Sequence, residues 1–221
     1  MRPSVPLILA AMVGIAAGIT VALSGPDSPG EGTASAEADL APLQAKMRNT
    51  VVLPEDFRRV PDFTLQAGDG AALEQDFLDD RWTLAFFGYT HCPDVCPITL
   101  QVMKNVVADL QAQDVEPMQV AFFTVDPVRD TAERMKEYVG FFDEDFVGVT
   151  GELNDVQALT RSLGIVSAFT AVEGKPDEYL VDHTASMLLI DPQRRVRAKF
   201  NAPHEADTIV QDFVTLREAL G

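Results

Sequence analysis

Two continuous apolar runs most restrict the folds available to this chain. Residues 82–88 read WTLAFFG and residues 118–125 read MQVAFFTV. Runs of this length, without alternation, are typical of strands buried on both faces of a sheet. Between them, Leu100, Met103, Val107 and Leu110 recur at helical spacing. A strand, a helix and a second buried strand predict an α/β domain.

The rest of the body continues this alternation. The patterns predict further strands at residues 61–65, 147–150, 165–172, 186–190 and 196–200, and helices at residues 99–110, 131–142, 152–163 and 205–220. The strands at 186–190 and 196–200 flank the turn sequence DPQRR, which indicates a hairpin. We therefore expect a central mixed sheet flanked by helices.

The N-terminal segment predicts export of the body. Residues 3–26 carry no charge, and residues 5–23 are nearly all apolar. A bilayer core needs about 20 such residues, so one transmembrane helix is expected at residues 1–25. Arg2 precedes the run and acidic residues follow it, which places the body in the periplasm, on the outer side of the inner membrane. The alternative is a cleaved signal peptide, whose apolar region is usually shorter, about 7–15 residues.

The expected organisation has three parts. Residues 26–53 are rich in Gly, Ser, Ala, Pro and Glu and predict a flexible linker between the anchor and a domain at residues 54–221. The formal net charge is −17, with 34 acidic and 17 basic residues. This balance argues against a nucleic-acid partner, because phosphate binding needs a basic surface.

The two cysteines, Cys92 and Cys96, lie between a buried strand and a helix. A pair this close indicates either a local redox couple or a shared metal ion. Pro97 has no N–H and fits the first helical position, with Cys96 near the N-cap. Both sulfurs would then meet the free N–H groups and the positive end of the helix dipole. We expect both to be thiolates near neutral pH, since this setting lowers a thiol pKa from about 8.5.

The chain has three histidines that could supply a third metal ligand. His183 precedes the strand at 186–190 and can approach the cysteine turn, although the sequence alone leaves it open between a ligand and a structural residue. Two thiolates favour Cu(I), and an added imidazole suits copper or zinc, so both metals remain candidates. His91 is interpreted as a modulating or surface residue, and His204 as a surface residue at the start of the last helix.

Three motifs together resemble the SCO/SenC family. They are FFGYTHCPDVCPITL at residues 86–100, TVDPVRDT at 124–131 and VDHTASMLLIDP at 181–192, in an order that matches the family from about residue 61 to the C-terminus. The resemblance implies a thioredoxin-like fold and a copper ion held by Cys92, Cys96 and His183. Asp126 and Asp130 fall on an acidic motif that either orients the site or a partner, or forms a turn and helix cap.

The resemblance also implies a function in assembling the CuA centre of cytochrome c oxidase. The expected activity is that of a copper chaperone, delivering Cu(I) to the copper-acceptor subunit of that oxidase. A periplasmic copper donor and a thiol reductant are further expected partners. The alternative is a thiol–disulfide oxidoreductase that reduces the acceptor cysteines before copper insertion. A peroxiredoxin-like peroxidase is disfavoured, because its single reactive-cysteine motif is not found.

Overall fold

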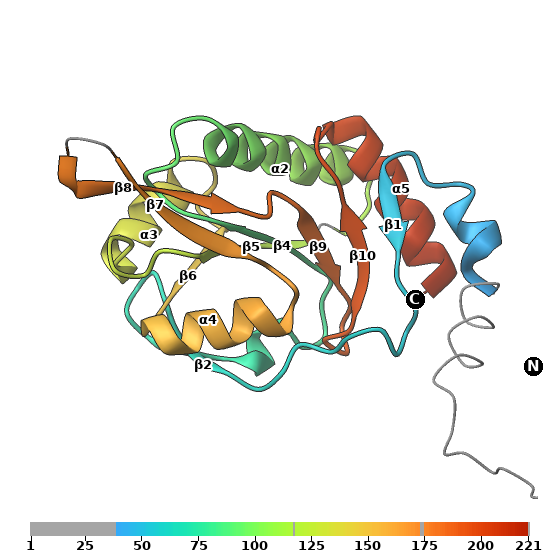
Figure 1. Ribbon diagram of the computed structural model, residues 1–221. Helices are drawn as coiled ribbons and strands as arrows, with labels where there is room; N and C mark the ends of the chain where they lie inside the picture. Colours follow the sequence, from blue (N-terminus) through green and yellow to red (C-terminus); the bar gives the residue numbers. More distant parts are fainter. Residues whose placement is uncertain (1–38, 117, 173–174, 221) are drawn as a thin grey trace, which may run out of the picture.

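The computed structural model describes residues 39–116, 118–172 and 175–220. Its centre is an eight-stranded mixed sheet in the order β1-β10-β9-β4-β5-β6-β2-β3 (Figure 1). β4, β5 and β6 are parallel, and β9 lies antiparallel to β4. The strands are β1 (Thr50–Val52), β2 (Thr64–Ala67), β3 (Ala72–Glu74), β4 (Thr83–Gly88), β5 (Gln119–Thr124), β6 (Val147–Thr150), β9 (Met187–Ile190) and β10 (Val196–Phe200). The predicted α/β class is confirmed.

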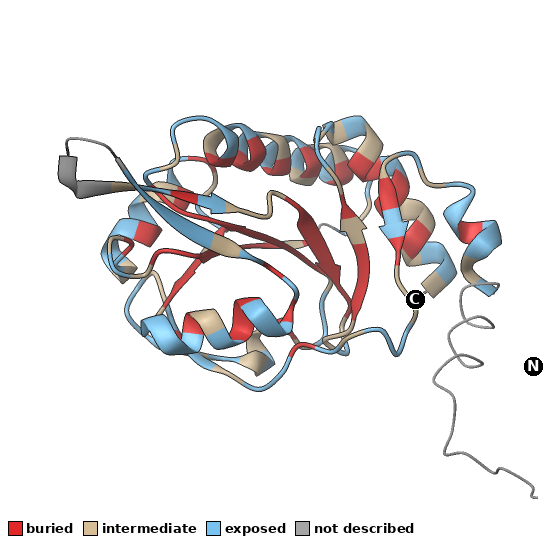
Figure 2. Ribbon diagram, viewed as in Figure 1, coloured by how far each residue is buried: buried red, intermediate tan, exposed pale blue. Residues whose placement is uncertain are grey.

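Helices cover both faces of this sheet. α2 (Val95–Ala112), α3 (Ala132–Gly140) and α5 (Ala206–Leu220) pack on one face, while α4 (Leu153–Ser162) and the 3-10 helix η1 (Gln75–Leu78) pack on the other. Every residue of β4 is buried, as is β5 after its first residue (Figure 2). The two apolar runs therefore form the centre of the domain, as the sequence predicts.

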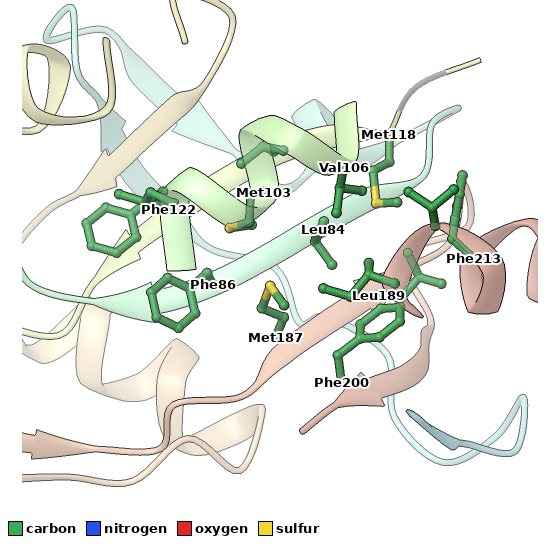
Figure 3. Close-up of a cluster of buried hydrophobic side chains, with 14 of the residues drawn as sticks. Leu84, Phe86, Met103, Val106, Met118, Phe122, Met187, Leu189, Phe200 and Phe213 are labelled. Carbon is green, nitrogen blue, oxygen red and sulfur yellow. The ribbon is translucent and has the colours of Figure 1, made fainter. Parts of the chain in front are cut away.

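The larger core cluster lies between the sheet and α2 and α5. Figure 3 shows Phe86 and Leu84 of β4 facing Met103 and Val106 of α2, with Met187 beside them. All five of these residues are fully buried. Because both faces of the strand are covered, β4 is held rigidly up to the point where it leads into the cysteine turn.

A separate two-stranded sheet carries one candidate ligand. β7 (Ser167–Val172) and β8 (Lys175–His183) form an antiparallel hairpin with Ser167 opposite His183. Figure 1 shows these strands running from the middle of the sheet past α3. β8 was not predicted, because its sequence, KPDEYLVDH, contains proline and several acidic residues that are rare in strands. His183 is thus the last residue of β8, whereas the sequence placed it in the loop before the strand at 186–190.

The domain begins earlier than the predicted boundary at residue 54. Residues 39–44 are helical, and β1 pairs with β10 with Thr50 opposite Phe200. The buried Asp212 carboxylate of α5 accepts a 2.5 Å hydrogen bond from the Thr50 hydroxyl. The Gln44 side chain donates to the Thr50 carbonyl at 2.8 Å and accepts from the Val52 N–H at 2.8 Å. These long-range contacts, which composition does not reveal, make residues 39–53 part of the fold and not of the linker.

The predicted anchor at residues 1–25 lies outside the described residues, as does the linker up to residue 38. Among the helices that the structure does describe, none has the length and apolar character needed to span a bilayer.

Candidate metal centre

The turn between β4 and α2 positions the two cysteines. The Cys92 N–H donates to the Tyr89 carbonyl at 3.2 Å, and α2 begins at Val95, with Asp94 as its N-cap. The prediction that Pro97 is the first helical residue is wrong, since the helix starts two residues earlier. Pro97 is tolerated in this first turn because the N–H groups there have no acceptor within the helix. Cys96 is consequently in the first turn and fully buried, while Cys92 is half-buried.

Gly88, the last residue of β4, makes room for the buried sulfur. A Cβ at this position would lie 2.6 Å from Cys96 Sγ and 2.8 Å from the Phe122 ring. Both distances are far below ordinary van der Waals contact. The sequence reasoning did not identify this residue, although its place directly before the cysteine motif was a possible signal.

His183 completes the group. Its Nε2 lies 3.7 Å from Cys96 Sγ, and the ligand atoms of Cys92, Cys96 and His183 all lie within 4.8 Å of one another. The predicted spatial convergence of these three residues is therefore present in the structure. His183 Nδ1 donates to the Thr184 carbonyl at 3.2 Å, so Nε2 is the ring nitrogen that faces the sulfurs. The ring of Tyr89 packs edge-on against the imidazole, with centroids 5.9 Å apart.

The two thiols differ in ionisation. The hydrogen bond from the Cys96 thiol is the main cause that lowers the pKa of Cys92 to about 3; burial opposes it, and His183 and the N–H groups of Cys96 and Asp94 reinforce it. The pKa of Cys96 is raised, because its proton is held in the bond to Cys92 and because the side chain is buried. The prediction of two thiolates is therefore wrong for the metal-free protein: one thiolate beside a buried thiol disfavours a second charge. Binding of a metal ion to both sulfurs would displace the remaining proton.

Asp130 orients the loop that carries the cysteines. It is fully buried and accepts hydrogen bonds from the Thr90 N–H at 3.0 Å, the Thr90 hydroxyl at 2.6 Å and the Thr124 hydroxyl at 2.7 Å. The cap of α3 is instead Thr131, whose side chain accepts from the Arg134 N–H at 3.3 Å. Both interpretations of the acidic motif hold in part: Asp130 orients the cysteine loop, and the chain turns at Asp126–Asp130 before the cap at Thr131.

Asp126 is also fully buried and faces the hairpin. It accepts a 2.7 Å hydrogen bond from the Tyr179 hydroxyl of β8 and forms an ion pair with Arg129. Neither Arg129 nor Tyr179 was identified from the sequence, because their contact with Asp126 depends on the fold of the hairpin.

The other two histidines lie outside the group of ligand atoms. His91 is half-exposed, with Nδ1 3.7 Å from Asp130 and 3.2 Å from the Thr90 hydroxyl, in agreement with a modulating or surface residue. His204 differs from the prediction of a surface residue: it is partly buried, and its Nε2 donates to the Ala185 carbonyl at 2.9 Å. Burial lowers the pKa of His204.

The donor set suits a soft metal ion. Two sulfurs and one imidazole nitrogen are ligands that Cu(I) accepts readily, and Zn²⁺ also uses both types. Residues 53–218 match the family model described as SCO1/SenC. The chain belongs to the SCO1/SenC family.

Relatives in the SCO1/SenC family connect the site with copper. The chain is 32% identical over 155 residues to the mitochondrial SCO1 homolog 1 of Arabidopsis thaliana, covering 69% of this chain and 45% of that protein. It thus spans about half the length of this mitochondrial relative. The crystal structure of Arabidopsis thaliana ScoI with copper bound has a TM-score of 0.68 at 30% identity, covering 72% of this chain and 98% of that one. Copper-bound structures therefore exist for proteins of the same family and fold.

A more distant structure shows the same fold. BsSco, described as a member of the Sco family of cytochrome c oxidase assembly proteins, has a TM-score of 0.57 at 22% identity, covering 77% of this chain and 96% of that one. The central mixed sheet flanked by helices, predicted from the sequence, is thus the architecture of Sco proteins.

Proposed function

We propose that this protein is a copper chaperone that binds Cu(I) through Cys92, Cys96 and His183 and delivers it to the CuA centre of cytochrome c oxidase. The observation that carries the proposal is the convergence of two sulfurs and one imidazole nitrogen within 4.8 Å. The copper-bound ScoI structure and the description of BsSco as an oxidase assembly protein support the metal and the acceptor.

The geometry suits transfer of the ion. Cys92 is half-buried, so an acceptor ligand can approach the metal from its side, whereas Cys96 is fully buried beneath it. Three ligands leave the coordination sphere open to an incoming thiolate or imidazole. Copper can then pass by stepwise ligand exchange, with each new acceptor bond replacing a bond to this protein.

The cellular setting belongs to the same proposal. The apolar residues 5–23 would hold the protein as a single-pass protein of the inner membrane, with the domain in the periplasm. The acceptor would be the copper-binding subunit of the oxidase. A periplasmic copper donor would load the site, and a thiol reductant would keep Cys92 and Cys96 reduced.

A second function is favoured by the unequal ionisation of the thiols. A half-buried Cys92 thiolate can attack an acceptor disulfide and form a mixed disulfide, releasing one acceptor thiolate. Cys96 then loses its proton and attacks Cys92, which releases the second acceptor thiolate. The acceptor gains two electrons, and this protein is left with a Cys92–Cys96 disulfide.

Competitive Cu(I) titration of the reduced protein tests the chaperone proposal. We expect one Cu(I) per chain in wild type, and an X-ray absorption spectrum with two sulfur ligands and one nitrogen ligand. His183→Ala should lose the nitrogen ligand and bind Cu(I) at least about 10-fold more weakly. The matched control is His91→Ala, which removes a neighbouring imidazole that lies beside Asp130. Unchanged affinity and coordination in His183→Ala would exclude the three-ligand site.

Trapping experiments test the reductase alternative. With Cys96→Ser, the mixed disulfide between Cys92 and an oxidised acceptor cannot be resolved and should accumulate. Cys92→Ser serves as the control, since it removes the attacking thiolate. If no mixed disulfide forms with the oxidised copper-acceptor subunit, the reductase function is excluded.

A further inference from the structure

A cluster next to the metal centre joins the hairpin to the body of the domain. Its middle is the Asp126 carboxylate, which is fully buried and receives hydrogen bonds from the Tyr179 hydroxyl and from Arg129. A buried carboxylate is tolerated only with such partners. Burial, and to a smaller extent the hydrogen bond to Asp126, raise the pKa of the Tyr179 phenol to about 12. Its hydroxyl therefore remains a donor at neutral pH.

Arg129 contacts both other members of the cluster, Asp126 and Tyr179. Besides its ion pair with Asp126, its Nη1 donates to the Tyr179 carbonyl at 3.1 Å. Its guanidinium carbon lies 3.7 Å from the centroid of the Tyr179 ring. One side chain therefore holds both the backbone and the ring of the same residue of β8. A planar guanidinium can donate in its plane and stack through its face, which a lysine ammonium cannot do.

The same guanidinium reaches the metal centre through Tyr89. Its carbon lies 5.7 Å from the centroid of the Tyr89 ring, on the way to the imidazole of His183. Tyr89 is only 4% exposed, and its carbonyl accepts from the Cys92 N–H. Tyr89 thus contacts three parts of the site: Arg129, the imidazole of His183 and the turn that carries Cys92.

The way β8 is built makes the position of His183 sensitive to side-chain contacts between the hairpin and the body. Tyr179, Val181 and His183 alternate along the strand and therefore share one face. Among the described strands, β8 forms backbone pairs only with β7, and a link of three residues joins His183 to Met187 of β9. Beyond that link, side-chain contacts with the body set the position of β8. The His183 ring packs against Phe86 with centroids 6.2 Å apart, and Val181, 4% exposed, supplies an apolar contact. Arg129 supplies a directional one.

We propose that Arg129 is a positioning residue of the metal centre, holding β8 through Tyr179 and Tyr89 so that the His183 imidazole lies beside the cysteine sulfurs. This inference rests on the proposed function, because it concerns the same site. It assigns to the TVDPVRDT motif the task of orienting the imidazole ligand, while Asp130 in that motif orients the turn that carries the thiol ligands.

A double-mutant cycle on Cu(I) affinity tests the proposal. Arg129→Ala should lower the affinity about 10-fold and weaken the nitrogen contribution in the X-ray absorption spectrum. In a His183→Ala background, the same change should leave the affinity unchanged, because no imidazole remains to be positioned. An equal loss in both backgrounds would show general damage to the site and overturn the proposal.

Three further variants separate positioning from folding. Arg129→Lys keeps the charge beside Asp126 but not the stacked plane. Its unfolding midpoint should therefore equal that of wild type, while its Cu(I) affinity should stay as low as in Arg129→Ala. Full recovery of affinity by lysine would contradict the role of the guanidinium plane. Tyr179→Leu removes the ring itself and should repeat the affinity loss, which keeps the test available if Arg129→Ala does not fold. Arg217→Ala, which removes an ion pair with Glu116, is the matched control and should leave affinity unchanged.

Hydrogen exchange of the metal-free protein provides a measurement independent of copper. Arg129→Ala should raise the exchange rates of amides 179–183 in β8 relative to those of β10. Unchanged exchange in β8 would overturn the positioning role even if copper affinity fell. If His183→Ala itself binds copper like wild type, the proposed ligand set fails, whereas the exchange result still reports on Arg129.

Discussion

Replacing Gly88 with alanine should damage the metal centre by crowding alone. The added Cβ would lie 2.6 Å from Cys96 Sγ and 2.8 Å from Phe122 Cε2. Ordinary contacts of this kind are about 3.5–4.0 Å, so each neighbour would have to retreat by roughly 1 Å. Gly88 does not have a positive φ angle in this structure, so backbone strain is not the cause.

Neither neighbour can retreat at low cost. Cys96 and Phe122 are both 0% exposed, and the Phe122 ring is confined by Phe86 at 5.8 Å and Tyr138 at 5.7 Å between centroids. Overpacking of a dense core typically costs about 1–3 kcal/mol. For a domain of this size, that corresponds to a fall in Tm of about 2–12 °C. Displacement of the Cys96 sulfur should also weaken Cu(I) binding by about 10-fold.

Thermal unfolding of the reduced protein and competitive Cu(I) titration measure the two effects. Gly140→Ala is the matched control, because a Cβ at Gly140, the last residue of α3, would meet no atom within 4 Å. That substitution should be neutral or stabilising by up to about 1 kcal/mol, since alanine is a better helix former than glycine.

A second substitution separates the two contacts. Phe122→Leu removes the ring edge that the new methyl group would meet. Gly88→Ala should therefore cost less stability in the Phe122→Leu background than in wild type. The copper affinity should stay low, because the contact with the Cys96 sulfur remains. Wild-type stability and affinity in Gly88→Ala would refute the close packing of β4 against that sulfur.

Three other results are expected. Alkylation of Cys92 in the reduced, metal-free protein should proceed at a nearly constant rate from pH 8 to about pH 4 and fall through about pH 3; a midpoint near the ordinary thiol value of about 8.5 would contradict the thiolate. Between about pH 3 and the ordinary thiol pKa, Cys92 is protonated in the unfolded chain but not in the folded protein. Its contribution to stability is therefore full above the ordinary thiol pKa and is lost as the pH falls toward 3. Cys92→Ser should flatten this part of the stability–pH curve. Thr90→Val should destabilise the domain by about 1–3 kcal/mol in urea unfolding because the buried Asp130 loses the hydroxyl donor, and Thr90→Ser should recover most of it; equal stability of the two variants would argue against that bond. His204→Ala removes the bond to the Ala185 carbonyl next to the imidazole ligand and should reduce Cu(I) affinity by up to about 10-fold, so an unaltered titration curve would show that this bond does not support the site.

The sequence by itself determined the centre of the fold and the cysteine pair, while His183 entered the expected ligand set only through the family resemblance. The apolar runs at 82–88 and 118–125 are β4 and β5, because a strand covered on both faces must be apolar at every position. The strand-to-helix turn after β4 places both cysteines together through local geometry alone. The three motifs at residues 86–100, 124–131 and 181–192 are enough to indicate the SCO/SenC family.

The start of α2 shows the limit of local reasoning. Proline excludes only the interior of a helix, so Pro97 was compatible with several positions in the first turn, and the structure places the start at Val95. β8 was missed for a related reason, since its sequence has little strand preference and the strand exists because it packs against the body of the domain.

Only the tertiary structure decided how the donor atoms meet and which of them is charged. Cys96 and His183 are 87 residues apart, and their 3.7 Å contact depends on where the hairpin packs. The ionisation of Cys92 depends on the proton held by a buried Cys96 beside it, which no helix-dipole argument specifies. The contact of Arg129 with Tyr179 likewise spans 50 residues. Burial patterns are local and can be read from periodicity, whereas contacts between distant segments arise only when the whole chain packs.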